Sequence, residues 1–99
     1  MKRDPVAGRK LLQLCAQVRD ALIGLLPGCG DAVLRELSVY LVEPAPNAGR
    51  LCVIVCIQDG GPDRDVARER LKKAAGMLRA EVAFSINRKH APELVFEVI

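Results

Sequence analysis

Hydrophobic positions near the start of the chain recur with the period of an amphipathic helix. The apolar residues that follow the i, i+3, i+4, i+7 rule are Leu11, Leu14, Cys15, Val18, Leu22 and Leu25. The pattern predicts a helix that begins at Arg9 and ends near Leu26, because Pro27 and Gly28 cannot continue it. Residues 1–8 are polar and contain Pro and Gly, so we expect a flexible N-terminal arm there and one domain over residues 9–99.

Two strand patterns follow the first helix. Residues 34–42 alternate, with Leu37, Val39 and Leu41 expected on one face and Ser38, Tyr40 and Val42 on the other. Residues 51–57 form a continuous apolar run, which is typical of an inner strand. Residues 43–49 contain two prolines and predict a loop that is too long for a tight turn. Strands joined by a short connection usually pair antiparallel, and we expect that here.

The pattern in the second half of the chain predicts a helix followed by a strand. After Pro62 an apolar stripe recurs at helical spacing, at Ala67, Leu71, Ala74, Leu78 and Val82. Gly76 interrupts this stripe at a cost of about 1 kcal/mol relative to Ala, which predicts a kink dividing the segment into two helices. A basic loop over residues 87–90 precedes a strand over residues 93–98, expected to run parallel to an earlier strand. The predicted order is α-β-β-α-α-β, an α+β fold.

Composition narrows the class of protein. The chain has 99 residues, enough for one domain, and is 51% hydrophobic and 27% charged, the balance of a globular protein. Aromatic residues make up only 3%, so recognition of nucleic acid by rows of stacking side chains is not expected. No apolar stretch has the length of a membrane span and no secretory signal is evident. We therefore expect a cytoplasmic protein that does not bind membranes.

The four cysteines do not predict a disulfide or a metal site. Cys52 and Cys56 would share one face of a strand about 13 Å apart, too far to bond. There is no CxxC motif and His90 is the only histidine, so we expect free thiols and no metal. A Cys29–His90 pair with a low-pKa thiol is the one arrangement that would suggest a small enzyme. With no phosphate-binding glycine loop either, we expect no enzyme activity and no cofactor.

Positive charge is concentrated in the last third of the chain. Residues 68–90 carry seven cations and two anions, five net positive charges, whereas the whole chain carries +3. Arg64, Arg68, Lys72 and Arg79 have the spacing of residues on one side of a helix. One interpretation is an ordinary solvated helix face. The other is a nucleic-acid contact, since Gly76, without a Cβ atom, lets a phosphate backbone approach the main chain.

The same segment carries a resemblance to a known family. Residues 71–81 and 92–96 resemble bacterial ribosome-binding factor A. Ala74, Ala75 and Gly76 match that family's Ala-x-Gly, which stands where KH domains carry a Gly-x-x-Gly loop, and Arg79 matches an Arg that commonly follows it. Pro92-Glu93-Leu94 matches the Pro-Glu-Leu that opens its last strand. The family's Asp-Pro-Arg after the first helix is absent here.

The resemblance implies a KH-like type II domain, with a three-stranded sheet and helices on one face. It further implies a monomeric assembly factor that binds immature 30S subunits and 16S rRNA near the decoding region. Such a factor assists late maturation and 5′-end rRNA processing, without a cofactor or a small-molecule substrate. The residues expected to bind RNA are Arg68, Lys72, Lys73, Ala74, Ala75, Gly76, Arg79, Arg88 and Lys89.

A protein-interaction module is the alternative. If the strand over residues 51–57 is covered on one side only, then Cys52, Ile54 and Cys56 form an exposed apolar patch. Such a patch would serve a partner protein or a dimer, with no ribosomal role.

Overall fold

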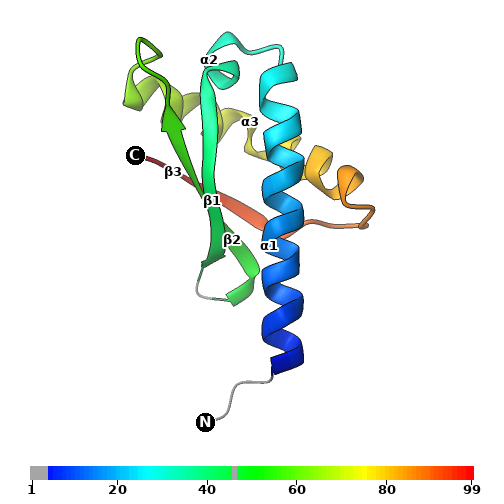
Figure 1. Cartoon of the computed structure of the whole chain (residues 1–99). Coiled ribbons are helices and arrows are strands. Elements are labelled where there is room, and N and C mark those ends of the chain that lie inside the picture. Colours follow the sequence, from blue (N-terminus) through cyan, green and yellow to red (C-terminus); the bar gives the residue numbers. More distant parts are fainter. Residues whose placement is uncertain (1–4, 46) are drawn as a thin grey trace.

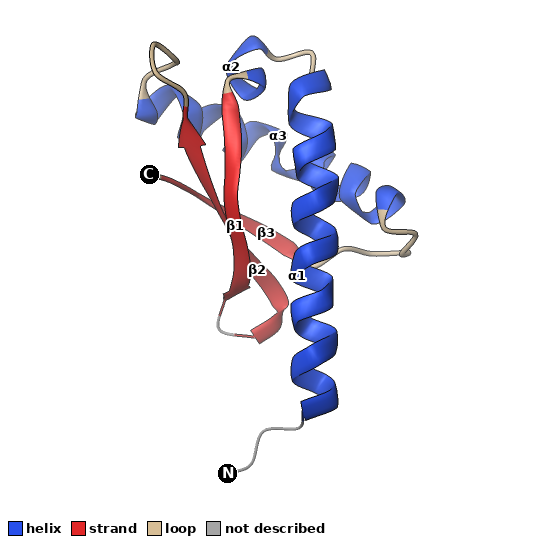
Figure 2. Ribbon diagram, viewed as in Figure 1, coloured by secondary structure: helices blue, strands red, loops and turns tan. Residues whose placement is uncertain are grey.

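The computed structural model describes residues 5–45 and 47–99, in which helices lie against a three-stranded sheet (Figures 1 and 2). In chain order the elements are α1 (Pro5–Leu25), the 3-10 turn η1 (Leu26–Gly28), α2 (Ala32–Arg35), β1 (Leu37–Ala45), β2 (Asn47–Ile57), α3 (Arg64–Ser85) and β3 (Glu93–Val98). The predicted α+β class is confirmed.

The sheet has the strand order β1-β2-β3. β1 and β2 are antiparallel, as expected for neighbours joined by a short connection, and β3 lies parallel to β2 after the α3 crossover. Alternate residues of β2 differ sharply in burial: Leu51, Val53 and Val55 are buried, whereas Cys52, Ile54 and Cys56 are partly exposed. One face of the sheet is therefore covered and the other is open.

The helices cover the first of these faces. α1 packs on β1, α3 packs on β3, and the two helices contact each other, as their crossing in Figure 1 indicates. Their inward residues are aliphatic, and none of the described polar side chains is buried. The largest fully buried side chains are Val18, Leu22, Leu26, Leu34, Leu51, Val53, Val55, Leu71, Leu78 and Val82. With so few aromatic residues, the core depends on close packing of branched aliphatic side chains.

Two aspartates begin the helices that follow α1. The Asp63 carboxylate accepts a hydrogen bond from the Asp65 amide at the start of α3 (3.1 Å), and Asp31 accepts one from the Val33 amide at the start of α2 (2.8 Å). Asp31 also pairs with Arg70 of α3 (2.9 Å), and that hydrogen bond lowers the pKa of the Asp31 carboxyl. The short helix α2, where a strand was expected to begin, is thereby joined to α3.

The first helix is longer than its apolar pattern predicts. α1 begins at Pro5, so residues 5–8 of the predicted arm are helical. Proline suits the first turn of a helix, because its backbone nitrogen needs no hydrogen-bond partner there. The remainder of the predicted arm, residues 1–4, lies outside the described residues.

The predicted long loop over residues 43–49 is wrong. β1 continues to Ala45 and β2 begins at Asn47, with Glu43 opposite Cys52 and Pro44 opposite Leu51. Pro44 is tolerated because β1 is an edge strand, where a missing backbone donor costs little. Cross-strand pairing thus overrides the loop composition in this hairpin.

A β-bulge changes which residues of β1 face the helices. The register shifts between Val39 and Leu41, so that Leu41 lies opposite Ile54 and Val42 lies opposite the buried Val53. The predicted alternation, with Leu41 on the same face as Val39, is therefore wrong beyond Tyr40. An extra residue in one strand inverts the alternation that follows it.

The expected division into two helices at Gly76 is not observed. α3 is a single helix, with Leu71 and Leu78 buried on either side of the glycine. Their packing outweighs the low helix propensity of one residue. No atom lies within 4 Å of the position that a Cβ would occupy at Gly76, apart from the helix's own neighbouring backbone. Within the described chain, no second backbone approaches this glycine.

Candidate nucleic-acid interface

The basic side of α3 lies beside its buried stripe. Leu71 and Leu78 point into the core. The residues that follow each of them in sequence, Lys72 and Arg79, lie on the neighbouring flank of the helix, which faces solvent. Arg68, Lys72 and Arg79 are all exposed on that flank. Three of the four cations that the spacing predicts to share one side of a helix therefore do so, and the fourth, Arg64, is the exposed first residue of α3.

The end of α3 and the segment after it enclose a hollow. Its volume is about 310 Å³, and its lining includes Gly76 and Arg79 from α3 with Lys89 and His90 from the following segment. Three residues of the predicted RNA-binding set, separated by up to 13 positions in sequence, thus meet in one place. Lys72 lies one helical turn before Gly76, on the same flank. We call Lys72, Arg79 and Lys89, together with Arg88 beside Lys89 in sequence, the basic strip.

A helix cap directs the second half of the basic strip back towards α3. Asn87 adopts a left-handed conformation (φ 57°), which asparagine accepts more readily than most residues. The Asn87 amide donates to the Phe84 carbonyl (3.1 Å) and the Arg88 amide to the Ala83 carbonyl (2.9 Å). These two bonds are the Schellman motif. They reverse the chain immediately before Arg88 and Lys89.

Arg79 has a structural contact that its place in the sequence does not reveal. Its Nε donates a 2.8 Å hydrogen bond to the carbonyl of the buried residue Ala91. The bond holds the segment after α3 against the helix and so shapes the hollow. The guanidinium keeps further N–H groups for a ligand. Arg79 is therefore both a positioning residue and a candidate ligand contact.

The remaining members of the predicted set are less available. Arg68 pairs with Asp65 (3.2 Å) and Lys73 pairs with Glu69 (3.5 Å), whereas no described ion pair includes a member of the basic strip. Lys73 and Ala74 line a different hollow, of about 470 Å³, between α2 and α3. Exposed ion pairs are worth only about 0–1 kcal/mol, so a polyanion can replace them. The structure does not bring Lys73 together with the basic strip.

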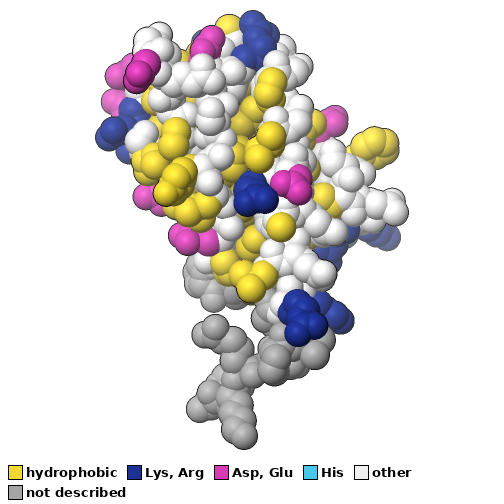
Figure 3. All heavy atoms as spheres, in the orientation of Figure 1, with side chains coloured by type: hydrophobic (Ala, Val, Ile, Leu, Met, Phe, Trp, Pro, Cys, Tyr) yellow, Lys and Arg dark blue, Asp and Glu magenta, His cyan; other side chains and the backbone are white. Residues whose placement is uncertain are grey.

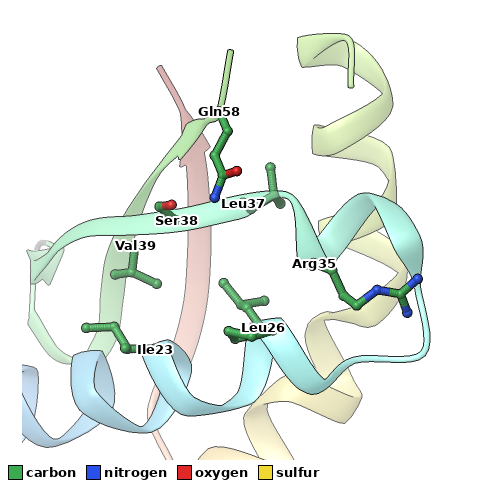
Figure 4. Close-up of a pocket in the computed structure, with 8 residues that line it drawn as sticks. Ile23, Leu26, Arg35, Leu37, Ser38, Val39 and Gln58 are labelled. Carbon is green, nitrogen blue, oxygen red and sulfur yellow. The ribbon is translucent and has the colours of Figure 1, made fainter. Parts of the chain in front are cut away.

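A third hollow, between the end of α1 and the start of β1, is unlike the first two (Figure 4). Its volume is about 410 Å³ and its walls include Ile23, Leu26 and Val39. Figure 4 shows the Arg35 side chain pointing away from these apolar groups, and its guanidinium donates to the Cys29 carbonyl (2.8 Å). This hollow therefore lacks a cation directed at a bound anion.

The residues considered for catalysis are not arranged for it. Burial first, and then Asp31, raise the pKa of the Cys29 thiol, which contradicts the low pKa that a nucleophile would need. The thiol donates to the Leu25 carbonyl (3.4 Å), and Cys29 and His90 line different hollows. Among the described side chains no three potential metal ligands gather. None of the described helices combines the length and the apolar character needed to cross a membrane.

Comparison with known proteins gives a consistent set of relatives, although no protein-family model matches the chain. Ribosome-binding factor A of Heliobacterium modesticaldum is 29% identical over 92 residues, which cover 92% of this chain and 76% of that protein. Ribosome-binding factor A of Thermomicrobium roseum is 34% identical over 68 residues, 69% of this chain and 53% of that protein. The sequence similarity thus extends over most of the chain.

Solved structures agree with these sequence relatives. The crystal structure of ribosome-binding factor A from Thermus thermophilus superposes with a TM-score of 0.74 at 25% identity, covering 88% of this chain and 93% of that one. A homology model of the Thermus thermophilus protein, fitted into a cryo-EM map of a 30S–ribosome-binding factor A complex, gives a TM-score of 0.70 at 26% identity and covers 86% and 90%. Similarity in sequence and in fold leads to one conclusion: this chain is similar over most of its length to ribosome-binding factor A.

Proposed function

We propose that this chain is an assembly factor that binds the immature 30S subunit through 16S rRNA, with the basic strip as its contact surface. The observation that carries the proposal is the hollow in which Gly76 and Arg79 of α3 meet Lys89. Support comes from relatives named for ribosome binding and from a relative fitted into a map of a 30S complex. We further propose contact near the decoding region and assistance with late maturation and 5′-end processing, by binding rather than catalysis.

The chemistry of the basic strip suits phosphates more than bases. Lys72, Arg88 and Lys89 present charged groups on long, exposed side chains, and His90 adds ring nitrogens in the hollow. The guanidinium of Arg79 can donate two parallel hydrogen bonds to two oxygens of one phosphate. With only one Tyr and two Phe in the chain, base stacking contributes little. Recognition would follow the shape and the backbone of the RNA.

Binding to small subunits is expected to weaken steeply with salt. If the basic strip and Arg68 engage about five phosphates, log Kd rises against log salt with a slope of about 3.5 to 4.5, because each contact releases condensed counterions. Titration of purified immature 30S particles by fluorescence anisotropy over a range of KCl concentrations measures this slope. A salt-independent Kd would contradict the electrostatic mechanism.

Gly76→Ala is expected to weaken small-subunit binding without destabilising the fold. No atom beyond the local helix backbone opposes a Cβ at Gly76, so alanine should stabilise α3 by up to about 1 kcal/mol. The added methyl group would nevertheless occupy the wall of the hollow, and we expect subunit binding to weaken severalfold. Thermal unfolding and anisotropy titration on the same samples measure the two effects.

Gly24→Ala is the matched control for this substitution. Gly24 lies exposed within α1, and its Cβ position is equally unobstructed. The control should raise stability by a similar amount and leave binding unchanged. If Gly76→Ala binds as tightly as Gly24→Ala, Gly76 is not a site of close approach by RNA.

Sedimentation in cell lysate tests the proposed function as a whole. Tagged protein should migrate with free small subunits at low salt and return to the top of the gradient at high salt. Protein that stays at the top at both salts would refute small-subunit binding.

A further inference from the structure

The open face of the sheet is chemically different from the helical side. Pairing aligns its residues in two rows across the strands: Glu43, Cys52 and Val95 in one, and Leu41, Ile54 and Glu97 in the next. Cys56 extends the apolar part beyond Ile54, opposite Ser38. We call Glu43, Leu41, Cys52, Ile54, Cys56, Val95 and Glu97 the sheet patch. In Figure 3, hydrophobic side chains gather over the strands beside α1, with acidic side chains at their margin.

The sheet patch is acidic although the chain as a whole is basic. The three strands contain Glu43, Glu93 and Glu97 but a single cation, Arg50. Arg50 is paired with Glu93 (3.0 Å), and no ion pair among the described residues includes Glu43 or Glu97. Cys52 lies between these two carboxylates. Burial raises the pKa of its thiol most, and the negative charges of Glu97 and Glu43 raise it further.

We propose that the sheet patch binds a lysine- or arginine-rich protein segment that also carries apolar side chains. Leu41, Ile54 and Val95 would pack against its apolar groups, while Glu43 and Glu97 at two edges of the patch pair with its cations. Charge complementarity of this kind selects the partner and speeds its association. The surface lies on the opposite side of the sheet from the helices.

The charge of the sheet patch argues against other occupants. RNA phosphates would meet two carboxylates and no unpaired cation from the strands, so the surface that suits RNA is the basic strip. A second copy of the chain would bring two acidic patches together, which like-charge repulsion disfavours. The inference does not depend on the proposed ribosomal role, because the basic strip and the sheet patch are separate surfaces.

Peptide titration with the full chain tests the proposal. The probe is a short fluorescent peptide of alternating lysine and leucine, and its matched control carries glutamate in place of lysine. We expect binding of the lysine peptide only, with amide shifts in nuclear magnetic resonance spectra centred on residues 41–43, 52–56 and 95–97. The double variant Glu43→Lys/Glu97→Lys should weaken this binding about tenfold or more, as removal of interfacial charge pairs typically does.

A charge-matched variant elsewhere controls for the overall charge. Asp20→Lys/Glu81→Lys alters the same number of charges on α1 and α3, and it should leave peptide binding unchanged beyond about twofold. Equal weakening in both double variants, shifts centred on the helices, or equal binding of the glutamate peptide would overturn the proposal. Dimerisation through the patch, seen as sedimentation that depends on concentration and is abolished by Glu43→Lys/Glu97→Lys, would also overturn it. Small-subunit binding is measured in parallel, so failure of that function is distinguished.

Discussion

Replacing Lys72 and Lys89 with glutamate together should reduce small-subunit binding by about a hundredfold or more at low salt, because two phosphate contacts become repulsions. The two lysines flank Gly76 from α3 and from the segment that follows it, and no described ion pair includes either of them. The salt slope should fall by about 2, because two phosphates are no longer neutralised. Anisotropy titration over a range of salt measures both effects.

The pair Lys72 and Lys89 is a cleaner choice than one that includes Arg79. Arg79 donates to the Ala91 carbonyl, so a glutamate there would disturb the fold as well as the charge. Surface substitutions without such contacts usually change stability by less than about 0.5 kcal/mol. Lys10→Glu/Arg19→Glu, on the exposed side of α1, is the charge-matched control. Equal weakening by both double variants would indicate attraction by net charge alone, and the basic strip would not be the contact surface.

Leu71→Ala should destabilise the domain by about 3 kcal/mol, because it opens a cavity where α3 meets the core. Leu71 is fully buried, and α3 is the helix that packs on β3. For a domain of this size the melting temperature should fall by about 15 °C. Urea denaturation and a thermal scan measure the destabilisation, which is a large share of the stability of a typical small domain.

Leu12→Ala is the matched control for Leu71→Ala. The same atoms are removed, but Leu12 lies on the outer side of α1 and is 67% exposed. Its effect should stay within about 0.5 kcal/mol. Similar destabilisation at both positions would mean that the packing of α3 on the sheet is not as described. At temperatures where Leu71→Ala remains folded, its subunit binding should match that of the natural chain.

Elements with strong local signals could be predicted closely. β3 begins at Glu93, as expected, because Pro92 and the alternation that follows it define a strand. α3 begins at Arg64, within two residues of the start predicted at Pro62. The basic flank of α3 also followed from residue spacing alone. Each of these predictions depends on neighbours within a few turns of the chain.

Features that depend on distant partners could not be predicted. The paired strands extend over residues 43–45 and 47–49 because each strand supplies hydrogen-bond partners that the composition of the segment does not reveal. The bulge at Tyr40 turns Leu41 outwards because one extra residue must fit against a regular strand. α3 continues through Gly76 because Leu71 and Leu78 are held by the core on either side.

Local patterns were enough to predict the fold class, the strand directions and the cations of the basic strip, since hydrophobic period and charge spacing are properties of short segments. The tertiary structure decides which of these cations lie close together. The Schellman cap at Asn87 and the bond from Arg79 to Ala91 bring Lys89 beside Gly76, whereas Lys73 faces α2. The folded chain also places Glu43 and Glu97, 54 residues apart in sequence, on the same open face. Side chains distant in sequence are brought together by packing and register, which no local pattern encodes.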